Sequence, residues 1–397
     1  MKTVSVIGMG YIGLPTSLVL SKSFHVQGYD IDSDKISKIN QKQLPFVEPG
    51  LDDLLKDAIE SKKLIASTQL IAADVYIICV PTPLTKEYPP KPDISYVEDA
   101  ADRISPLLKD NDLVILESTS PVGTTEMIDA LIRQNRSDLE RVSVAYCPER
   151  VLPGNIYHEL INNDRIIGGV DQDSSEHARN FYKEVIRGEI FLTNDKTAEL
   201  CKLSENAYRD INIAFANELS MIADENNVDI YDLIKLTNKH PRVDILTPGV
   251  GVGGHCIAVD PWFIIDKTSR GKLIQTSRET NLEKTQWCFE KVADSCRNNV
   301  NQKILCLGAS YKPNIDDVRE SPAIDMYNKL RKDFRNVKIY EPNTSVNTDK
   351  LGEVLEEISN SDVIICLVEH DEFKDQKVKQ AIKQKQYFDF CSLMRQS

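Results

Sequence analysis

Short apolar runs alternate with longer amphipathic segments over the first 150 residues of the chain. The apolar runs lie at residues 2–7, 26–29, 75–80, 113–117 and 142–146, and the segments between them have apolar positions at helical spacing. Apolar runs of this length are typical of strands buried on both faces. Their alternation with helices predicts a doubly wound α/β domain built on a parallel sheet.

The pattern changes after residue 195. Neither glycine nor proline occurs from Lys196 to Asp232, and apolar residues recur there at helical spacing. We expect one continuous helix of about 50 Å, which suits a connector between two domains or a dimer interface. A second helix is predicted at about residues 273–298.

Strand and helix patterns then alternate again. The apolar runs are residues 303–307, 337–340, 362–368 and 387–389. The sequence therefore predicts two Rossmann-like domains joined by a long central helix and a helical dimerisation region. The expected parts are 1–195, 196–298 and 299–397, and the middle part also carries the candidate nucleophile Cys256.

Bulk composition excludes several kinds of protein. The formal net charge of -13 argues against nucleic-acid binding, which needs a basic face. No apolar run is long enough to span a bilayer, and the chain opens directly into a strand, so we expect a cytoplasmic protein. None of the nine cysteines has CxxC spacing, and Cys79, Cys306 and Cys366 lie in apolar runs, so we expect neither a metal site nor disulfides.

A glycine motif comes after the first predicted strand. Gly8, Gly10 and Gly13 form GxGxxG between that strand and a helix, and Asp30 ends the next strand. In this context the glycines allow a tight turn, a close approach of a pyrophosphate to the helix N-terminus, and helix–strand packing. Asp30 would bind the ribose hydroxyls and repel a 2′-phosphate, and no arginine comes closely after it, so NAD is preferred to NADP.

A second glycine-rich segment, 248–261, presents Cys256 after four glycines in six residues, with His255 beside it and Asp260 four residues on. A cysteine on such a segment indicates a nucleophile at a ligand surface. The competing interpretation is a structural cysteine. In an NAD enzyme, a thiolate would trap an aldehyde as a thiohemiacetal, which a second hydride loss turns into a thioester that water releases as an acid.

Further candidates lie at strand ends and on the long helix. Ligands bind beyond the carboxyl ends of strands in open α/β sheets, which makes the turns 80–83, 118–121 and 147–150 candidates. Lys202, Asn206 and Arg209 share one helix face, and Glu149 and Arg150 end a strand. From spacing alone, both sets could equally be solvated surface charges.

Ordered sequence blocks along nearly the whole chain resemble the UDP-glucose/GDP-mannose dehydrogenase family. These blocks are SVIGMGYIGLPT, VPTP, ESTSPVGTTE, YCPERVLPGN, ELCKLSENAYRDINIAFANEL, HPRVDI, GVGGHCIAVDPWFI and YKPNIDDVRESPA. The combination of CPERVLPG, NKHPRV and GVGGHCIAVDPWF is most similar to the members that oxidise UDP-N-acetyl-D-mannosamine for bacterial surface polysaccharides.

The resemblance implies roles for individual positions. Cys256 would be the nucleophile and Lys202 the proton donor or acceptor at C6, with Glu149, Thr119, Asp260 and Asn206 assisting. NAD would contact Gly8, Gly10, Tyr11, Ile12, Gly13, Asp30, Lys35, Thr82, Thr119 and Arg319. The nucleotide sugar would contact Arg150, Val151, Lys202, Asn206, Arg209, His240, Arg242, Gly253, Tyr311 and Lys312.

The resemblance also implies a reaction and a partner. The expected reaction is four-electron oxidation of the UDP-sugar at C6 by two NAD+, in a homodimer formed on the central helices. UDP-N-acetylglucosamine and UDP-glucose remain alternative substrates, because spacing does not show the pocket around C2. Two hypotheses outside this chemistry are a one-step hydroxyacid dehydrogenase, which needs no Cys256, and a non-catalytic NAD-binding scaffold.

Overall fold

The computed structural model describes residues 2–46, 48–152, 154–343 and 353–395. The chain divides into two compact units. The N-terminal unit comprises Met1–Ser204 and Trp262–Thr268, and the C-terminal unit comprises Glu205–Pro261 and Ser269–Ser397. The division into three parts at residues 195 and 298 stays a prediction.

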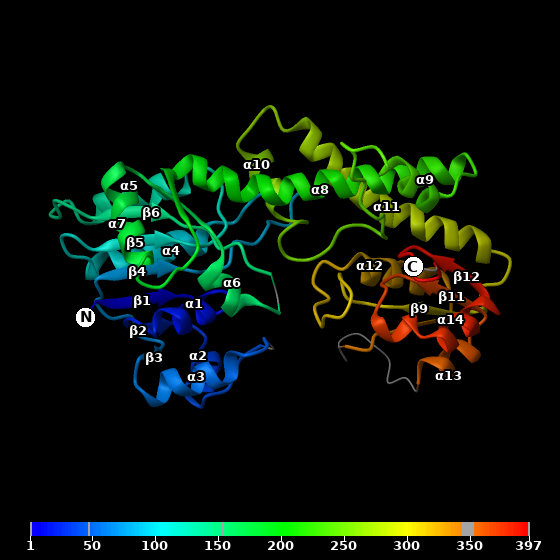
Figure 1. The fold of residues 1–397 in the computed structure, drawn as a ribbon, viewed down its shortest axis with the longest axis horizontal. Helices are drawn as coiled ribbons and strands as arrows, with labels where there is room; N and C mark the ends of the chain where they lie inside the picture. The colour runs from blue at the N-terminus through cyan, green and yellow to red at the C-terminus, as the bar shows by residue number, and fades with distance from the viewer. Residues whose placement is uncertain (1, 47, 153, 344–352, 396–397) are drawn as a thin grey trace. The chain divides into compact units, whose positions relative to one another are not determined.

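The N-terminal unit is built on an eight-stranded sheet (Figure 1). Its strands are β1 (Thr3–Ile7), β2 (His25–Tyr29), β3 (Leu64–Ser67), β4 (Val75–Ile78), β5 (Leu113–Leu116), β6 (Ser143–Tyr146), β7 (Arg165–Gly169) and β8 (Ile190–Asn194), in the order β3-β2-β1-β4-β5-β6-β7-β8. Its helices are α1 (Gly13–Leu20), α2 (Ser33–Asn40), α3 (Leu51–Glu60), α4 (Ser95–Ile104), α5 (Thr124–Asn135), α6 (Ile156–Asn162) and α7 (Gln172–Tyr182). The first six strands have the order of a dinucleotide-binding fold.

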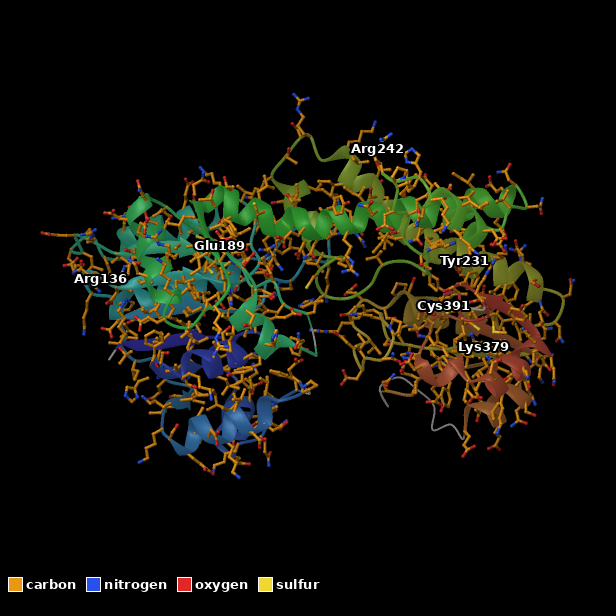
Figure 2. All side chains as sticks on the ribbon, viewed as in Figure 1. Arg136, Glu189, Tyr231, Arg242, Lys379 and Cys391 are labelled. Atoms are coloured by element: carbon orange, nitrogen blue, oxygen red, sulfur yellow. The ribbon has the colours of Figure 1, made fainter. Side chains whose placement is uncertain are left out.

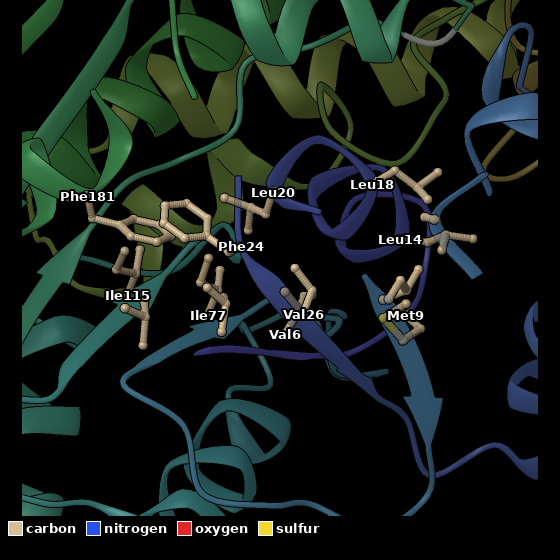
Figure 3. Packing of buried hydrophobic residues seen from close by; sticks show 14 of the residues in the cluster. Val6, Met9, Leu14, Leu18, Leu20, Phe24, Val26, Ile77, Ile115 and Phe181 are labelled. Carbon is tan, nitrogen blue, oxygen red and sulfur yellow. The ribbon is translucent and has the colours of Figure 1, made fainter. Parts of the chain in front are cut away.

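Side chains alternate between the two faces of this sheet, as the doubly wound prediction requires. In β4, Val75 and Ile77 pack with residues of α1 and α7, while Tyr76 and Ile78 pack with residues of α4 and α5. Figure 3 shows the first of these layers, with Ile77 near Val6 and Val26. Both faces are therefore covered by helices, and the short apolar runs are explained.

One strand pair departs from the predicted parallel sheet. β7 runs antiparallel to β6, with Ala145 opposite Gly169. Among the described residues of the connection between them, α6 is the only helix or strand, and it packs on α1. The chain therefore enters β7 at the end of the sheet where it left β6, and it makes no crossover between them. β3, β7 and β8 were also not predicted.

The long helix ends earlier than predicted. α8 spans Asp195–Glu225 and a separate helix, α9, spans Ile230–Thr237, so one continuous helix over 196–232 is wrong. Asn227 between them has φ 54°, in the left-handed region that asparagine tolerates at a helix C-terminus. The Asp229 carboxylate then accepts hydrogen bonds from the amides of Tyr231 and Asp232 and begins α9.

The C-terminal unit contains a smaller parallel sheet in the order β10-β9-β11-β12. Its elements are α11 (Lys272–Cys296), β9 (Lys303–Leu307), α12 (Pro322–Asp333), β10 (Asn336–Tyr340), α13 (Val354–Ser359), β11 (Val363–Cys366), α14 (Gln376–Lys383) and β12 (Gln386–Asp389). The short helix α10 (Asp260–Asp266) begins in this unit, but its residues from Trp262 onward are assigned to the N-terminal unit. One face packs with α11 and α12, and the other with α13 and α14. The predicted second α/β domain is confirmed.

Candidate active site

The glycine turn after β1 leaves open space at one position only. A side chain on Gly8 would lie 2.5 Å from the Cys79 carbonyl oxygen, and one on Gly13 would lie 1.8 Å from the Gly8 carbonyl oxygen. A Cβ on Gly10 would meet no atom within 4 Å. Gly8 and Gly13 therefore serve the fold, whereas Gly10 borders space in front of the first turn of α1. In a dinucleotide-binding fold the pyrophosphate lies at this end of the first helix.

Asp30 stands at the end of β2, beside this turn. Its buried carboxylate accepts hydrogen bonds from the Met9 amide at 2.8 Å and the Asp32 amide at 3.0 Å. Lys35 Nζ, also predicted at the cofactor, lies 2.7 Å from the same carboxylate. The structure thus brings two predicted cofactor residues together where a ribose would lie in this fold.

Glu48 is a site residue that the sequence did not indicate. Its buried carboxylate accepts hydrogen bonds from the Tyr11 hydroxyl at 2.8 Å and from the amides of Gly154 and Ile156 at 2.9 and 3.0 Å. The Tyr11 ring also packs on Phe46. Glu48 therefore positions Tyr11, and no local pattern could have found a carboxylate whose amide partners lie more than 100 residues away.

Two further cofactor candidates meet at neighbouring strand ends. The Thr82 hydroxyl, after β4, donates to the Thr119 carbonyl oxygen, after β5, at 2.8 Å. Both threonines are half-buried. This placement agrees with the expectation that ligands bind beyond the carboxyl ends of parallel strands.

Lys202 is not part of a solvated helix face. Its side chain is 7% exposed, and its Nζ lies 3.7 Å from Glu149 Oε1. Glu149, at 13% exposure, also accepts a hydrogen bond from the Val151 amide at 2.9 Å. A buried amine beside a carboxylate is a suitable acid–base group.

Cys256 is exposed in the C-terminal unit, as predicted for a nucleophile. Its carbonyl oxygen accepts hydrogen bonds from the amides of Val259 and Asp260, which close a turn at the start of α10. The buried Asp260 carboxylate accepts a hydrogen bond of 2.6 Å from Asn206 Nδ2. Two predicted catalytic residues therefore meet directly behind the cysteine turn.

The segment before Cys256 is tethered by a buried polar chain between α8 and α11. The Gly249 amide donates to Asn217 Oδ1 at 2.9 Å, and Asn217 Nδ2 donates to Asn281 Oδ1 at 2.9 Å. Asn281 in turn donates to Asp210, which pairs with Arg278 at 2.6 Å. No sequence pattern indicated these tethering residues, because asparagines on long helices are usually solvated.

The predicted substrate residues Gly253 and Tyr311 lie in contact. A Cβ on Gly253 would lie 2.9 Å from Tyr311 Cβ, and one on Gly254 would lie 2.8 Å from the Tyr311 ring. Gly254, with φ 84°, also donates its amide to the Arg319 carbonyl oxygen at 3.2 Å. Arg319 itself binds Asp317 through Nε and Nη2. The glycines therefore allow close packing between the cysteine segment and the loop after β9.

The remaining predicted substrate residues lie at the surface. Arg150 lines a surface pocket of about 550 Å³ with Phe191 and Cys201. Arg242 and His240 are exposed after α9, and Arg242 is labelled in Figure 2. Arg209 and Lys312 are also exposed. Each unit supplies its own set of these residues, and their role at the substrate stays a prediction.

The described part of the chain was also compared with the features of a metal site and of a membrane-spanning helix. No group of three or more potential ligand side chains there could hold a metal ion. Among the described helices, none is both long and apolar enough to cross a membrane.

Three family models of the UDP-glucose/GDP-mannose dehydrogenase family match the chain: the NAD binding domain at residues 2–186, the central domain at 196–283 and the UDP binding domain at 305–396. The chain is 46% identical to the NDP-N-acetyl-D-galactosaminuronic acid dehydrogenase of Ralstonia solanacearum, covering 94% of this chain and 92% of the relative. It is 44% identical to the UDP-N-acetyl-D-mannosamine dehydrogenase of Escherichia coli, covering 94% of both.

Solved structures give the same result. The UDP-D-ManNAc dehydrogenase from Pyrococcus horikoshii superposes with a TM-score of 0.92 at 36% identity, covering 100% of this chain and 96% of the other. The UDP-N-acetyl-mannosamine dehydrogenase from Staphylococcus aureus has a TM-score of 0.90 at 38% identity, with the same coverage. The NAD binding domain also agrees with the cofactor expected from Asp30. The chain therefore belongs to the UDP-glucose/GDP-mannose dehydrogenase family and is an NAD-dependent UDP-sugar dehydrogenase.

Proposed function

We propose that the protein oxidises C6 of UDP-N-acetyl-D-mannosamine from an alcohol to a carboxylate, consuming two NAD+ and one water. The observation that carries this proposal is the exposed Cys256 on a glycine-rich turn, with the Asn206–Asp260 pair directly behind it. A dehydrogenase that stops at the aldehyde has no need of an exposed thiol in this position.

Lys202 and Glu149 supply the acid–base chemistry of the first oxidation. Lys202 Nζ takes the proton of the C6 hydroxyl, and the nearby Glu149 carboxylate stabilises the ammonium that results. NAD+, when bound, accepts one hydride in each of the two oxidations. The products of this step are a C6 aldehyde and one proton held by the protein.

Cys256 retains the aldehyde for the second oxidation. The thiol adds across the C6 carbonyl: its sulfur bonds to C6 and its S–H proton goes to the carbonyl oxygen, which gives a thiohemiacetal on the protein. Loss of a hydride from C6 and of the hydroxyl proton gives a thioester. Water then adds to the carbonyl, Asp260 or Glu149 accepts a water proton, and the thiol leaves as the carboxylate forms.

The sugar identity is inferred from the relatives, which favour a 2-acetamido sugar. Relatives from Escherichia coli and Staphylococcus aureus are named for UDP-N-acetylmannosamine. The relative from Ralstonia solanacearum is named for N-acetyl-D-galactosaminuronic acid. UDP-N-acetyl-D-galactosamine is therefore the second candidate substrate, with the same chemistry at C6.

Tyr311 and Lys312 are assigned to the nucleotide part of the substrate. They lie in the segment matched by the UDP binding domain. Lys312 is exposed and would pair with a diphosphate, which also explains how a protein of net charge -13 binds an anion.

The decisive experiment measures moles of NADH formed per mole of nucleotide sugar consumed. UDP-N-acetyl-D-mannosamine should give a ratio of about two, because thioester formation requires a second hydride transfer. The galactosamine, glucosamine and glucose nucleotides are tested alongside. A ratio of about one would contradict the covalent mechanism, and preference for another sugar would reassign the substrate.

Replacing the nucleophile tests the same mechanism independently. Cys256→Ser should abolish acid formation. A serine adduct would be oxidised to an ester, and an alkoxide is a much poorer leaving group than the thiolate of a thioester. Cys391→Ser is the matched control, since Cys391 is half-buried after β12 and its thiol donates to Asp389, a bond that serine can keep. Acid formation at the wild-type rate by Cys256→Ser would disprove the role of the thiol.

The protein is also proposed to be a homodimer that pairs through α8. Tyr208, Phe215 and Ile222 recur every seven residues on this helix and are 71%, 53% and 49% exposed. Residues seven apart lie on one helix face, and an apolar stripe of this length on a charged protein indicates an interface.

A further inference from the structure

The glycines that follow β1 and β9 have nearly the same φ and make equivalent backbone hydrogen bonds. Gly8 has φ 95° and donates its amide to the Tyr29 carbonyl oxygen at 2.8 Å, and Gly308 has φ 94° and donates to the Tyr340 carbonyl oxygen at 2.8 Å. In each unit an acidic residue then ends the neighbouring strand. Asp30 accepts from the Met9 amide, and Glu341 accepts from the Ala309 amide at 2.7 Å.

The two units differ in the length of chain between this turn and the next helix. In the N-terminal unit, β1 ends at Ile7 and α1 begins at Gly13. In the C-terminal unit, β9 ends at Leu307 and α12 begins only at Pro322. The intervening residues 309–320 form a loop that carries Tyr311, Lys312 and Arg319. We call it the β9 loop.

Both carboxylate oxygens of Glu341 accept hydrogen bonds from protein groups. One carboxylate oxygen accepts from the amides of Ala309 and Ser310 and from His370 Nε2 at 3.0 Å. The other accepts from the Asn343 amide and side chain. Burial alone would raise the pKa of Glu341, but the hydrogen bonds from His370 and Ala309 outweigh it and lower the pKa to about 2. The carboxylate is therefore ionised at any working pH.

His370 joins this carboxylate to the middle of the β9 loop. The imidazole is fully buried. Its Nδ1 accepts hydrogen bonds from the Asn314 backbone amide at 3.0 Å and from Asn343 Nδ2 at 2.9 Å, and a backbone amide N–H can only donate. Its Nε2 must then carry the proton that it gives to the ionised Glu341. Through Nε2 the ring is bonded to Glu341 and lies 3.3 Å from the Ser310 hydroxyl at the start of the β9 loop. Through Nδ1 it is bonded to Asn314 in the middle of the loop and to Asn343 after β10.

The β9 loop makes further contacts with Asp371, within itself and with the glycines that precede Cys256. The Asn314 side chain accepts from the Asp371 amide at 3.0 Å, and the Ser310 hydroxyl donates to the Lys312 carbonyl oxygen at 2.9 Å. The loop ends against Gly253 and Gly254, where the Tyr311 ring and the Glu320 carbonyl leave no room for a Cβ. A movement of the loop would therefore displace both Tyr311 and the residues immediately before Cys256.

We propose that His370 and Glu341 are positioning residues that lock the β9 loop in place, so that Tyr311 and Lys312 receive the UDP part of the substrate beside the Cys256 segment. The inference deepens the proposed function and rests on it. Neither residue touches the reacting atoms. Their effect should fall chiefly on nucleotide-sugar binding and change NAD binding by about twofold at most, because Arg319 is the single predicted NAD contact in the β9 loop and the others lie in the N-terminal unit.

The test compares three substitutions at His370 in the full-length protein. His370→Ala removes all the hydrogen bonds of the ring, to Asn314 and Asn343 at Nδ1 and to Glu341 and Ser310 at Nε2. His370→Asn places an amide oxygen where Nδ1 accepts from Asn314, and His370→Gln places an amide N–H where Nε2 donates to Glu341. His177→Ala is the matched control, because His177 is half-buried on α7 in the other unit and its ring bonds to the Ser143 hydroxyl at 3.0 Å.

For His370→Ala we expect a rise of at least about tenfold in the KM for the UDP-sugar and in the Kd for UDP alone, with the KM for NAD within about twofold of wild type. His370→Asn should recover most of the loss, because it keeps the tether to Asn314 in the middle of the loop, and His370→Gln should recover less. His177→Ala should change neither constant.

Equal rises in both KM values, or no rise in the KM for the UDP-sugar, would overturn the proposal. If His370→Ala does not fold, the asparagine and glutamine variants test the proposal instead. If both bind UDP with wild-type affinity, His370 does not hold the β9 loop in place. UDP binding is measured by calorimetry without turnover. If the wild-type protein binds UDP but oxidises no UDP-sugar, the proposed function is wrong. The role of His370 is still tested in that case, because the UDP affinities of the variants do not depend on turnover.

Discussion

At the scale of single residues, buried carboxylates hold the loops of this protein by accepting from backbone amides. Asp30, Glu48 and Glu341 each accept from at least two main-chain N–H groups. Glu199 does the same at the start of α5, with the amides of Gly123 and Thr125 at 2.6 and 2.8 Å. Such bonds offset the cost of burying a charge and fix irregular backbone in one conformation.

Asp112 is a buried carboxylate with less compensation. Burial raises its pKa to about 6, against the lowering effect of one backbone hydrogen bond from Lys109, and the charge of Asp74 raises it further. The folded protein therefore binds this proton more tightly than the unfolded chain. Asp112 therefore contributes most to the stability of the folded protein below about pH 4, where it is protonated. This contribution is lost as the pH rises to about 6.

Asp112→Asn should accordingly stabilise the protein at about pH 7, by about 3 kcal/mol at most, because asparagine keeps the acceptor for Lys109 without the charge. The gain should shrink as the pH falls from about 6 to about 4. Thermal unfolding of both proteins at several pH values measures this difference. A gain that does not vary with pH would show that the buried charge is not its cause.

The residues with short-range signals could be predicted, and those with long-range partners could not. Cys256 comes after a glycine cluster and Asp30 ends a strand after GxGxxG, so both have local context. Glu48, Asn217 and His370 bond residues between 27 and 108 positions away. Only the folded chain brings such partners together.

At the scale of secondary structure, boundaries depend on a few residues that periodicity does not detect. The apolar pattern of α8 continues past its end, but Asn227 takes a left-handed conformation and Asp229 begins a new helix. The strand β8 escaped prediction because it is an edge strand with no fully buried residue. The central strands β1, β2, β4, β5 and β6 were predicted because both of their faces are apolar, whereas the central strand β7, which contains Arg165 and two glycines, was not.

The glycine turn gives a prediction in which two similar substitutions have opposite effects. Gly13→Ala should destabilise the N-terminal unit severely, because its Cβ would overlap the Gly8 carbonyl. Gly10→Ala should leave folding unchanged, since its Cβ meets nothing, yet weaken NAD binding by at least about tenfold by filling space next to the phosphates.

Thermal unfolding without ligand and titration with NAD separate the two effects. Wild-type NAD affinity in Gly10→Ala would show that the cofactor does not approach this turn. Wild-type stability in Gly13→Ala would show that the turn can shift to admit a side chain.

At the scale of the whole molecule, each unit has its own two-layered core, and α8 continues from one unit into the other. This long helix carries two of the proposed catalytic residues, Lys202 and Asn206, and an exposed apolar stripe at Tyr208, Phe215 and Ile222. The sequence predicted its helical period. It did not predict the stripe, since apolar positions that face inwards and outwards look alike until the fold is known.

A dimer that pairs through this stripe should dissociate when the stripe becomes charged. Tyr208→Asp combined with Phe215→Asp places two carboxylates where an apolar contact is proposed, and burying them unpaired would cost more than an interface of ordinary size provides. The wild-type protein should sediment as twice the 44.8 kDa chain and the double variant as a single chain.

Ile71→Asp combined with Tyr96→Asp is the matched control, because these side chains are 57% and 45% exposed in the N-terminal unit and the added charge is the same. The control should remain dimeric. If the stripe variant also remains dimeric, the chains associate through another surface. If both variants dissociate, added negative charge on a protein of net charge -13 is the cause rather than loss of a specific contact. Only dissociation of the stripe variant alone places the interface on α8.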